Sequence, residues 1–212
     1  MKRLLIIGAG GFGREVLNWA LDVLPENRNW EVGGFLDANP AVLDAYDCGF
    51  PILDDPLNYV PEDNDRFVCA IGHPLTKLRV CRSLNERGAQ FITLIHPTAV
   101  VGSRCFIGEG CVFCPGAVVT TDVKIGEFVM INLQSTIGHD VIVADGCTLS
   151  PHADVNGYAS LGEGVFLGTH AVILPGAKIG DYAIVGAGSV VLKNVKAGAT
   201  VMGVPAKQIA GF

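Results

Sequence analysis

The chain has 212 residues, half of them hydrophobic and 17% charged, which is the composition of a globular protein with room for one large or two small domains. The formal net charge is −6 and no basic run occurs, which argues against nucleic acid and anionic membrane surfaces as partners. The apolar run at residues 4–7 is too short for a signal peptide, and no stretch approaches the ~18 apolar residues of a membrane span. We therefore expect no membrane insertion.

The seven cysteines are an odd number, which disfavours a disulfide framework. We expect neither disulfides nor a structural zinc site. Free thiols persist in reducing compartments, so the expected location of the protein is the cytoplasm.

Residues 1–94 alternate apolar runs with helical patterns. The apolar runs predict buried parallel strands, and they cover residues 3–8, 30–37, 66–72 and 89–96. The helical patterns cover residues 14–24 and 75–87. This alternation predicts an α/β domain in which helices flank a small parallel sheet, equivalent to half of a Rossmann fold.

From residue 95 onward the sequence repeats every six residues. Every sixth residue from Ile95 to Val191 is aliphatic or Phe, and the residue four positions later is small or Val. Repeats of this kind indicate a β-helix of hexapeptide repeats, in which short strands coil around a narrow prism and these two positions fill its interior. Cys105, Cys111 and Cys147 occupy the small interior position, so we interpret them as core residues and not as nucleophiles.

Three hexads per coil make an 18-residue coil, so the seventeen hexads that begin in the segment 95–212 predict between five and six coils. Glycine follows the inward aliphatic residue in eight hexads, where we expect it to ease the turn at each corner. The chain thus divides into two predicted domains, residues 1–94 and residues 95–212.

A glycine-rich segment follows the first predicted strand and opens the first predicted helix. Gly8, Gly10 and Gly13 form a G-x-G-x-x-G pattern, which lets the backbone approach a phosphate at a helix start. Asp37 ends the second strand 24 residues after Gly13, where a ribose-binding carboxylate could lie. NAD(P) is one candidate ligand, but half a Rossmann fold suits a mononucleotide or a nucleotide sugar better. A tight turn without a ligand is the third possibility.

Four of the five histidines have alternative structural roles. His73 follows Gly72 at the carboxyl end of a strand, where open α/β sheets bind ligands, and His96 lies at the domain junction with an expected structural role. His152 and His170 are 18 residues apart, so we expect them to stack at one corner on successive coils. A shared metal, as in a metal-dependent hydratase, is conceivable there, but a solvent-facing polar stack is the favoured interpretation.

The fifth histidine has a setting that suits catalysis. His139 lies on a corner with Asp140 as its immediate neighbour, and one coil later the corresponding position is Gly157. The missing side chain at Gly157 leaves room beside the imidazole and exposes a backbone N–H for a ligand. A neutral imidazole can accept a proton near pH 7, so His139 is the candidate general base.

The chain as a whole resembles a family of bacterial sugar acyltransferases that includes bacillosamine N-acetyltransferase, perosamine N-acetyltransferase and sialic acid O-acetyltransferase. The resemblance rests on the order and spacing of the segments GAGGFGREVL, GFLD, CAIG, LIHPTA, IGHD, the hexads and GVPAK. It implies a left-handed β-helix, a homotrimer, a sugar nucleotide bound by the N-terminal domain, and acetyl-CoA as co-substrate in the groove between two neighbouring helices. No metal is implied.

The resemblance also implies roles for individual residues. His139 matches the family's general base, Asp140 the acid beside it, and Gly157 the glycine whose N–H meets the acetyl carbonyl. The remaining residues that it implies are Asn132, Ala187 and Lys207 for acetyl-CoA, and Gly8, Gly10, Gly11, Asp37, Gly72 and His73 for the nucleotide sugar.

Two departures from the family pattern leave the acceptor open. Bacillosamine enzymes have Glu where this chain has Asp140, and a second His where it has Thr148. The favoured hypothesis is acetylation of a nucleotide-activated amino sugar in bacterial surface-glycan biosynthesis. The alternatives are O-acetylation of sialic acid or another free sugar, and a module that binds NAD(P) or another nucleotide and is trimerised by the β-helix.

Overall fold

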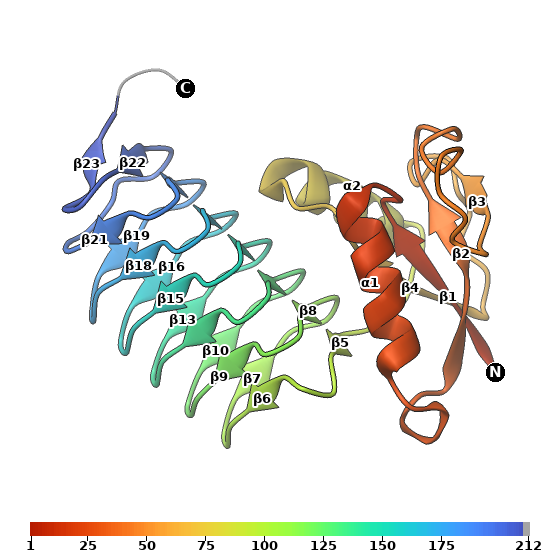
Figure 1. Cartoon of the computed structure of the whole chain (residues 1–212), viewed down its shortest axis with the longest axis horizontal. Coiled ribbons are helices and arrows are strands. Elements are labelled where there is room, and N and C mark those ends of the chain that lie inside the picture. Colours follow the sequence, from red (N-terminus) through yellow and green to blue (C-terminus); the bar gives the residue numbers. More distant parts are fainter. Residues whose placement is uncertain (210–212) are drawn as a thin grey trace.

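The structure is a computed structural model that describes residues 1–209. It has two parts, a parallel sheet with two helices and a long β-helix (Figure 1). The elements of the first part are β1 (Lys2–Ile7), α1 (Gly11–Asp22), the 3₁₀ turn Pro25–Asn27, β2 (Trp30–Leu36), β3 (Ile52–Asp54), β4 (Asp65–Cys69) and α2 (Pro74–Glu86).

The four strands are parallel and lie in the order β3-β2-β1-β4, with α1 and α2 on opposite faces. Successive residues of a strand point to opposite faces, so β1 serves both cores. Leu4 and Ile6 pack with α1, whereas Leu5 and Ile7 pack with α2. All four are fully buried, which is why β1 is a continuous apolar run and not an alternating one.

One of the predicted strands, residues 89–96, is wrong as a strand of this sheet. The apolar run at 89–96 does not form a strand of this sheet, because Phe91 makes only a single bridge to Phe67 and Leu94–Ile95 pairs with the β-helix instead. The edge strand of the sheet is the three-residue β3, which the sequence pattern did not reveal. The run 89–96 is apolar because it lies between the two cores: Phe91 packs on the α2 side of the sheet and Leu94 on the α1 side.

The β-helix has three faces made of short strands. The first face holds β5 (Leu94–Ile95), β8 (Val112–Phe113), β11 (Met130–Ile131), β14 (Thr148–Leu149), β17 (Phe166–Leu167), β20 (Ile184–Val185), β22 (Thr200–Met202) and the antiparallel β23 (Lys207–Gln208). The second face holds β6 (Val100–Val101), β9 (Val118–Val119), β12 (Thr136–Ile137), β15 (Asp154–Val155), β18 (Val172–Ile173) and β21 (Val190–Val191). The third face holds β7 (Phe106–Ile107), β10 (Lys124–Ile125), β13 (Ile142–Val143), β16 (Ser160–Leu161) and β19 (Lys178–Ile179).

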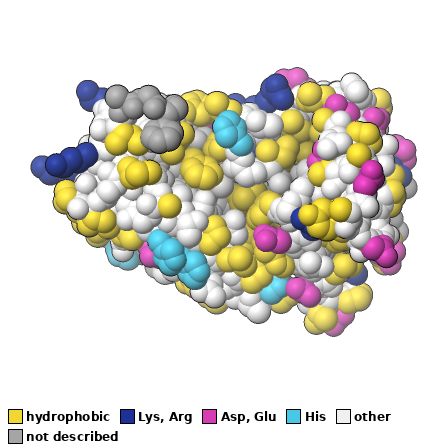
Figure 2. Space-filling view, turned by 45° about the horizontal axis from the view of Figure 1, so that its top comes forward, with side chains coloured by type: hydrophobic (Ala, Val, Ile, Leu, Met, Phe, Trp, Pro, Cys, Tyr) yellow, Lys and Arg dark blue, Asp and Glu magenta, His cyan; other side chains and the backbone are white. Residues whose placement is uncertain are grey.

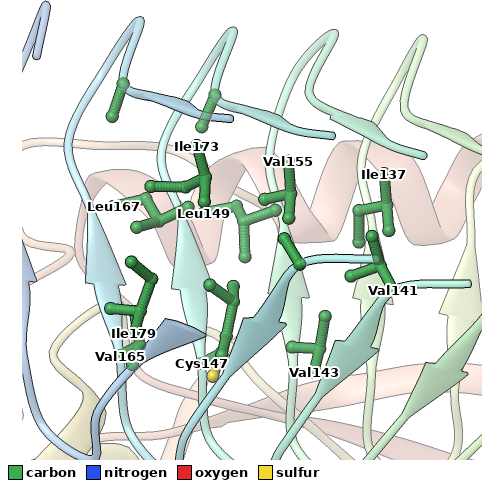
Figure 3. Packing of buried hydrophobic residues seen from close by; sticks show 14 of the residues in the cluster. Ile137, Val141, Val143, Cys147, Leu149, Val155, Val165, Leu167, Ile173 and Ile179 are labelled. Atoms are coloured by element: carbon green, nitrogen blue, oxygen red, sulfur yellow. The ribbon is translucent and has the colours of Figure 1, made fainter. Parts of the chain in front are cut away.

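The 18-residue coil is confirmed by the strand register. Ile137 pairs with Val155, and Val155 with Ile173, so residues one coil apart lie side by side. The predicted inward residues from Phe113 onward are buried, and Figure 3 shows a set of them converging inside the prism. Ile95, at the open start of the coil, is 40% exposed because no earlier coil covers it.

The reason we expected for the corner glycines is wrong. From Val101 to Val185, positive φ falls on the third residue after each inward residue. All nine non-glycine residues with positive φ in the described chain, Asp140 among them, occupy that position. The glycine directly after the inward residue is needed for a different reason. A Cβ on Gly138 would lie 2.8 Å from the backbone nitrogen of Gly157, so adjacent coils could not stack at this spacing.

All seven cysteines are free thiols. Cys111 and Cys114 have C-x-x-C spacing, but they belong to different cores: Cys111 fills the β-helix, whereas Cys114 packs with α1. Burial raises the pKa of the Cys111 and Cys147 thiols to about 12, which keeps them protonated. The prediction that Cys111 and Cys147 are core residues is confirmed. Cys105, near the start of the coil, packs against the same core but is only partly buried.

Candidate active site

The His139–Asp140 pair lies at the corner between the second and third faces. His139 Nδ1 is 2.9 Å from Asp140 Oδ2, and the two side chains are 53% and 43% exposed. The backbone holds the corner on both sides, because Asp140 N–H donates to Thr121 O of the preceding coil and His139 O accepts from Tyr158 N of the next. The imidazole thus has one nitrogen beside a carboxylate, while the ring remains accessible.

Gly157 lies directly against the imidazole. A Cβ on Gly157 would be 2.7 Å from both Nε2 and Cε1 of His139, so any side chain there would displace the ring. Tyr158 meets the same ring edge-on, with the centroids 5.0 Å apart. Among residues 1–209 the Gly157 N–H has no protein acceptor. The structure therefore brings His139, Asp140 and Gly157 together as the sequence predicted.

The other predicted acetyl-CoA residues lie elsewhere on the same chain. Asn132 and Ala187 follow inward residues of the first face, so they lie at the corner between the first and second faces, separated from His139 by the second face. Lys207 is on β23, where it shares with Lys193 and Lys196 the lining of a cavity of about 390 Å³. Within one chain these residues do not form a common site with His139.

The glycine-rich segment has the geometry of a strand–helix turn braced by Asp37. Asp37 Oδ2 accepts from Ala9 N at 2.8 Å, and Oδ1 accepts from Asn39 N at 2.9 Å. A Cβ on Gly13 would collide with Gly8 O, so the third glycine permits the close approach of helix and strand. Gly10 and Gly11 instead face open space or a distant arginine tip, which leaves the start of α1 accessible.

Gly72 and His73 lie where β4 passes into α2, beside the β-helix. His73 is the N-cap of α2, and its Nδ1 accepts from Thr76 N at 3.4 Å. A cavity of about 230 Å³ separates this helix start from the first face; it is lined by His73, Pro74, Leu75, Gly164, Phe166, Tyr182 and Ile184. Gly72 itself has open space on its Cα. The predicted nucleotide-sugar residues thus line one edge of the sheet and the domain junction.

Two of the histidines on the β-helix stack as predicted. His152 and His170 have ring centroids 4.6 Å apart and planes 4° apart. His96 lies at the junction, where its ring nitrogens contact Thr98 Oγ1 at 2.8 Å and Asp22 Oδ2 at 3.2 Å.

Residues 1–209 contain no group of three or more His, Cys, Asp or Glu side chains suited to a metal ion. The helices in the same range are all too short or too polar to cross a membrane.

Two buried polar residues at the junction were missed by the sequence analysis. Lys77 is 1% exposed and Thr148 is 3% exposed, and Lys77 Nζ lies 2.8 Å from Thr148 Oγ1. A signal was present: Lys77 occupies the apolar stripe of α2 together with Pro74, Leu78, Cys81 and Leu84, where a solvated lysine does not belong. Thr148 was noted only as the position where the family has a histidine.

Comparison with known proteins gives matches for both parts of the chain. Residues 3–84 match the family model described as the PglD N-terminal domain, and residues 158–193 match the bacterial transferase hexapeptide (six repeats). PerB from Caulobacter crescentus, solved in complex with CoA and GDP-perosamine, is 32% identical, with 99% of this chain and 98% of that chain covered and a TM-score of 0.89. The chain belongs to the bacterial sugar acyltransferase family.

Other members of this acyltransferase family have the same architecture. WeeI from Acinetobacter baumannii AYE is 30% identical over 99% of this chain and 100% of that one, with a TM-score of 0.88. The acetyltransferase domain of PglB from Neisseria gonorrhoeae FA1090, in complex with acetyl coenzyme A, is 29% identical over 98% and 99%, with a TM-score of 0.87. GDP-perosamine N-acetyltransferase of Escherichia coli O157:H7 is 32% identical over 138 residues, which span 63% of this chain and 61% of that protein.

Proposed function

We propose that this protein transfers the acetyl group of acetyl-CoA to the amine of a nucleotide-linked amino sugar, with His139 as the general base. The observation that carries the proposal is the His139–Asp140 pair, held at 2.9 Å on a coil corner against the bare face of Gly157. The family supports the substrate class, because PerB was solved with CoA and GDP-perosamine, and the PglB domain with acetyl coenzyme A.

The proposed reaction is a direct transfer. The sugar amine attacks the thioester carbonyl, and His139 Nε2 takes a proton from the amine as the C–N bond forms. Nδ1–H donates to Asp140, which fixes the tautomer and stabilises the imidazolium. The C–S bond then breaks, and the imidazolium returns the proton to the departing CoA sulfur. The products are the N-acetyl sugar and CoA, and the enzyme forms no covalent intermediate.

The oxyanion of the tetrahedral intermediate needs a donor beside His139. The Gly157 N–H lies next to the imidazole and has no protein acceptor in the described chain. A preorganised donor of this kind contributes about 3 kcal/mol to transition-state stabilisation. Glycine serves here because the approach to its backbone is not blocked by a side chain.

We propose that the working unit is a homotrimer with acetyl-CoA in the groove between neighbouring β-helices. Large hydrophobic side chains lie exposed at outward positions of the coils, among them Val100, Phe106 and Ile142. Figure 2 shows hydrophobic areas on the β-helix in the face that it presents. Asn132, Ala187 and Lys207 are remote from His139 within one chain, so they meet it only if a second copy supplies one side of the groove.

We assign nucleotide binding to the edge formed by Gly8, Gly10, Gly11, Asp37, Gly72 and His73. The start of α1 offers free N–H groups to a phosphate, and Asp37 holds the turn through Ala9. We further infer a role in bacterial surface-glycan biosynthesis, and a cytoplasmic location because all seven thiols are free.

The first test is a substrate panel with acetyl-CoA and UDP-, GDP- and CMP-linked sugars that carry either an amine or only hydroxyls. We expect CoA release with one amino-sugar nucleotide. His139→Ala should then lower kcat by about 10³-fold, the scale of a general base. Glu109→Gln, an exposed side chain on the corner between the third and first faces, is the control and should keep wild-type kcat. A His139→Ala variant with most of its kcat would contradict the assignment.

Gly157→Ala tests the geometry without removing a functional group. The new methyl group would displace the imidazole, since 2.7 Å is shorter than any tolerated carbon contact. We expect kcat to fall by about 10²-fold. The stability should change little, because the displaced atoms are the end of an exposed side chain. Retention of wild-type kcat would show that the proposed oxyanion position is wrong.

A further inference from the structure

A lysine without a carboxylate partner is buried between α2 and the β-helix. Lys77 Nζ donates to Cys147 O at 3.0 Å and to Thr148 Oγ1 at 2.8 Å, and no ion pair to Lys77 occurs within residues 1–209. Burial lowers the pKa of Lys77, and the nearby thiols of Cys69 and Cys147 oppose that shift. This is an unfavourable place for an ammonium group.

The Thr148 hydroxyl connects Lys77 to the segment between β4 and α2. Its hydroxyl accepts from Lys77 and donates to Gly72 O at 2.8 Å. Thr148 occupies an outward position on β14, yet it is 3% exposed because it lies beneath the N-terminal part. The Lys77–Thr148–Gly72 chain therefore links a coil of the β-helix to the segment between β4 and α2.

The linked segment borders the proposed nucleotide site. Gly72 is followed by His73, the N-cap of α2 and a lining residue of the cavity at the junction. It is preceded by Ala70 and Ile71, which lie against the glycine-rich turn: a Cβ on Gly8 would be 3.2 Å from Ala70 O. A shift of the Gly72 carbonyl would therefore move both His73 on one side of that site and the Ala70–Ile71 segment on the other.

Stability does not account for the lysine. Cys147 O already accepts from Met130 N at 2.9 Å, so this carbonyl is paired without Lys77. Burying a charged group without a countercharge costs free energy, so an apolar residue of similar volume at this position should not be less stable. Leu78, the next residue on α2, already docks the helix by filling the space above Gly146. The specific consequence of the Lys77–Thr148 contact is the position of Gly72.

We propose that Lys77 and Thr148 are positioning residues that hold the Gly72–His73 segment in the geometry required to bind the nucleotide part of the substrate. This inference rests on the proposed function. It predicts that the pair acts on nucleotide-sugar affinity, and not on acetyl-CoA binding or on the chemical step.

The test measures both KM values and kcat for Thr148→Val, with the nucleotide sugar on which the wild type is most active. We expect the KM for this sugar to rise about tenfold, the scale of one lost hydrogen bond, while the KM for acetyl-CoA and kcat change less than about twofold. Thr148→Ser keeps the hydroxyl and should restore the wild-type value. Thr200→Val, at the same hexad position on β22, is the control and should leave all three constants unchanged.

Lys77→Met separates positioning from stability. We expect the thermal midpoint to equal or exceed that of the wild type while the KM for the nucleotide sugar rises. An unchanged KM for the nucleotide sugar in both variants would overturn the inference. It would also be overturned if both KM values rose and kcat fell by the same factor while the thermal midpoint dropped. If the wild type turns over no nucleotide sugar, the proposed function fails instead. Calorimetry with GDP- and UDP-sugars then decides the inference, because wild type and Thr148→Val must still differ in affinity.

Discussion

The β-helix and the N-terminal sheet place their residues by different means. In the β-helix each side chain has its neighbours 18 residues away in both directions, so its position follows from counting. In the sheet, β3 joins the edge after a long connection. The half-buried Arg3 on β1 donates to Asp65 and Tyr59, which ties the start of the chain to the segment that leads into β4. Figure 2 shows acidic side chains gathered over the N-terminal part, where some Lys and Arg also lie, and Lys and Arg at the far end of the β-helix.

The contrast bears on how the proposed site is built. A stack of coils is a regular scaffold, and it presents His139 and Gly157 at a spacing set by the repeat. The N-terminal part supplies turns that can contact a ligand, but their positions depend on contacts with the scaffold, such as Thr148 to Gly72. The site therefore combines a periodic half with an aperiodic half.

The largest effect on stability is expected from Leu149→Ala inside the β-helix. Leu149 is fully buried between coils, and the rigid stack cannot collapse around the lost atoms. We expect the free energy of unfolding to fall by about 4 kcal/mol. Leu192→Ala, at an outward position that is 51% exposed, is the control and should cost little. Denaturant unfolding at fixed protein concentration measures both. A loss at Leu149 no larger than at Leu192 would contradict the packed interior.

In the sheet the residue whose replacement should cost most stability is polar: the buried Asp65. Burial acts to raise the pKa of Asp65, but hydrogen bonds from Arg3, Glu62 N and Tyr59 outweigh it, so its pKa lies below the usual value. We expect Asp65→Asn to cost about 3 kcal/mol at neutral pH. The buried Asp65 carboxylate accepts from Arg3, Tyr59 and the Glu62 N–H, and an amide with one acceptor oxygen cannot accept from all three.

The pH dependence gives this prediction its sign. Since the native pKa of Asp65 is lower than the unfolded one, its stabilisation is complete above the unfolded pKa and is lost as pH falls through the native value. Wild type and Asp65→Asn should therefore converge in acid, as measured by unfolding at a series of pH values. Parallel curves would show that the carboxylate has no special stabilising role.

A comparison of Gly138 with Gly176 tests why the repeat requires glycine directly after the inward residue. Gly138→Ala should cost about 2 kcal/mol, because the methyl group would meet the Gly157 backbone and force two coils apart. Gly176→Ala has positive φ but open space around it, so it should cost only the ~1 kcal/mol of left-handed backbone. Thermal unfolding of both variants decides. A larger loss of stability for Gly176→Ala than for Gly138→Ala would mean that Gly138 is needed for the turn and not for the stacking of coils.

The smallest effect concerns the exposed ion pair that also joins the two parts. Arg82 Nη2 lies 2.6 Å from Glu163 Oε2, but the arginine side chain is 47% exposed. We expect Arg82→Ala to cost about 0.5 kcal/mol in dilute buffer, and the difference from wild type should vanish at high salt because surface charges are screened. A cost that persists in high salt would mean that Arg82 acts through packing.

Much of the fold and of the candidate site could be predicted from the sequence. The hexads predicted the β-helix, its interior and its 18-residue register, because the prism repeats the same local environment at every coil. The neighbourhood of His139, Asp140 and Gly157 followed from the same counting. The G-x-G-x-x-G pattern placed the turn at Gly8, and the apolar run of β1 predicted a strand buried on both faces.

Only the tertiary structure decided how the two parts meet. The short edge strand β3, the split role of residues 89–96 and the buried Lys77–Thr148 contact each depend on residues far apart in the chain, whose spacing carries no period. The close stacking of coils likewise explains Gly138, which sequence alone had assigned to a turn. Periodic contacts are encoded locally and can be counted, whereas aperiodic ones exist only after the chain has folded and brought distant atoms within hydrogen-bonding distance.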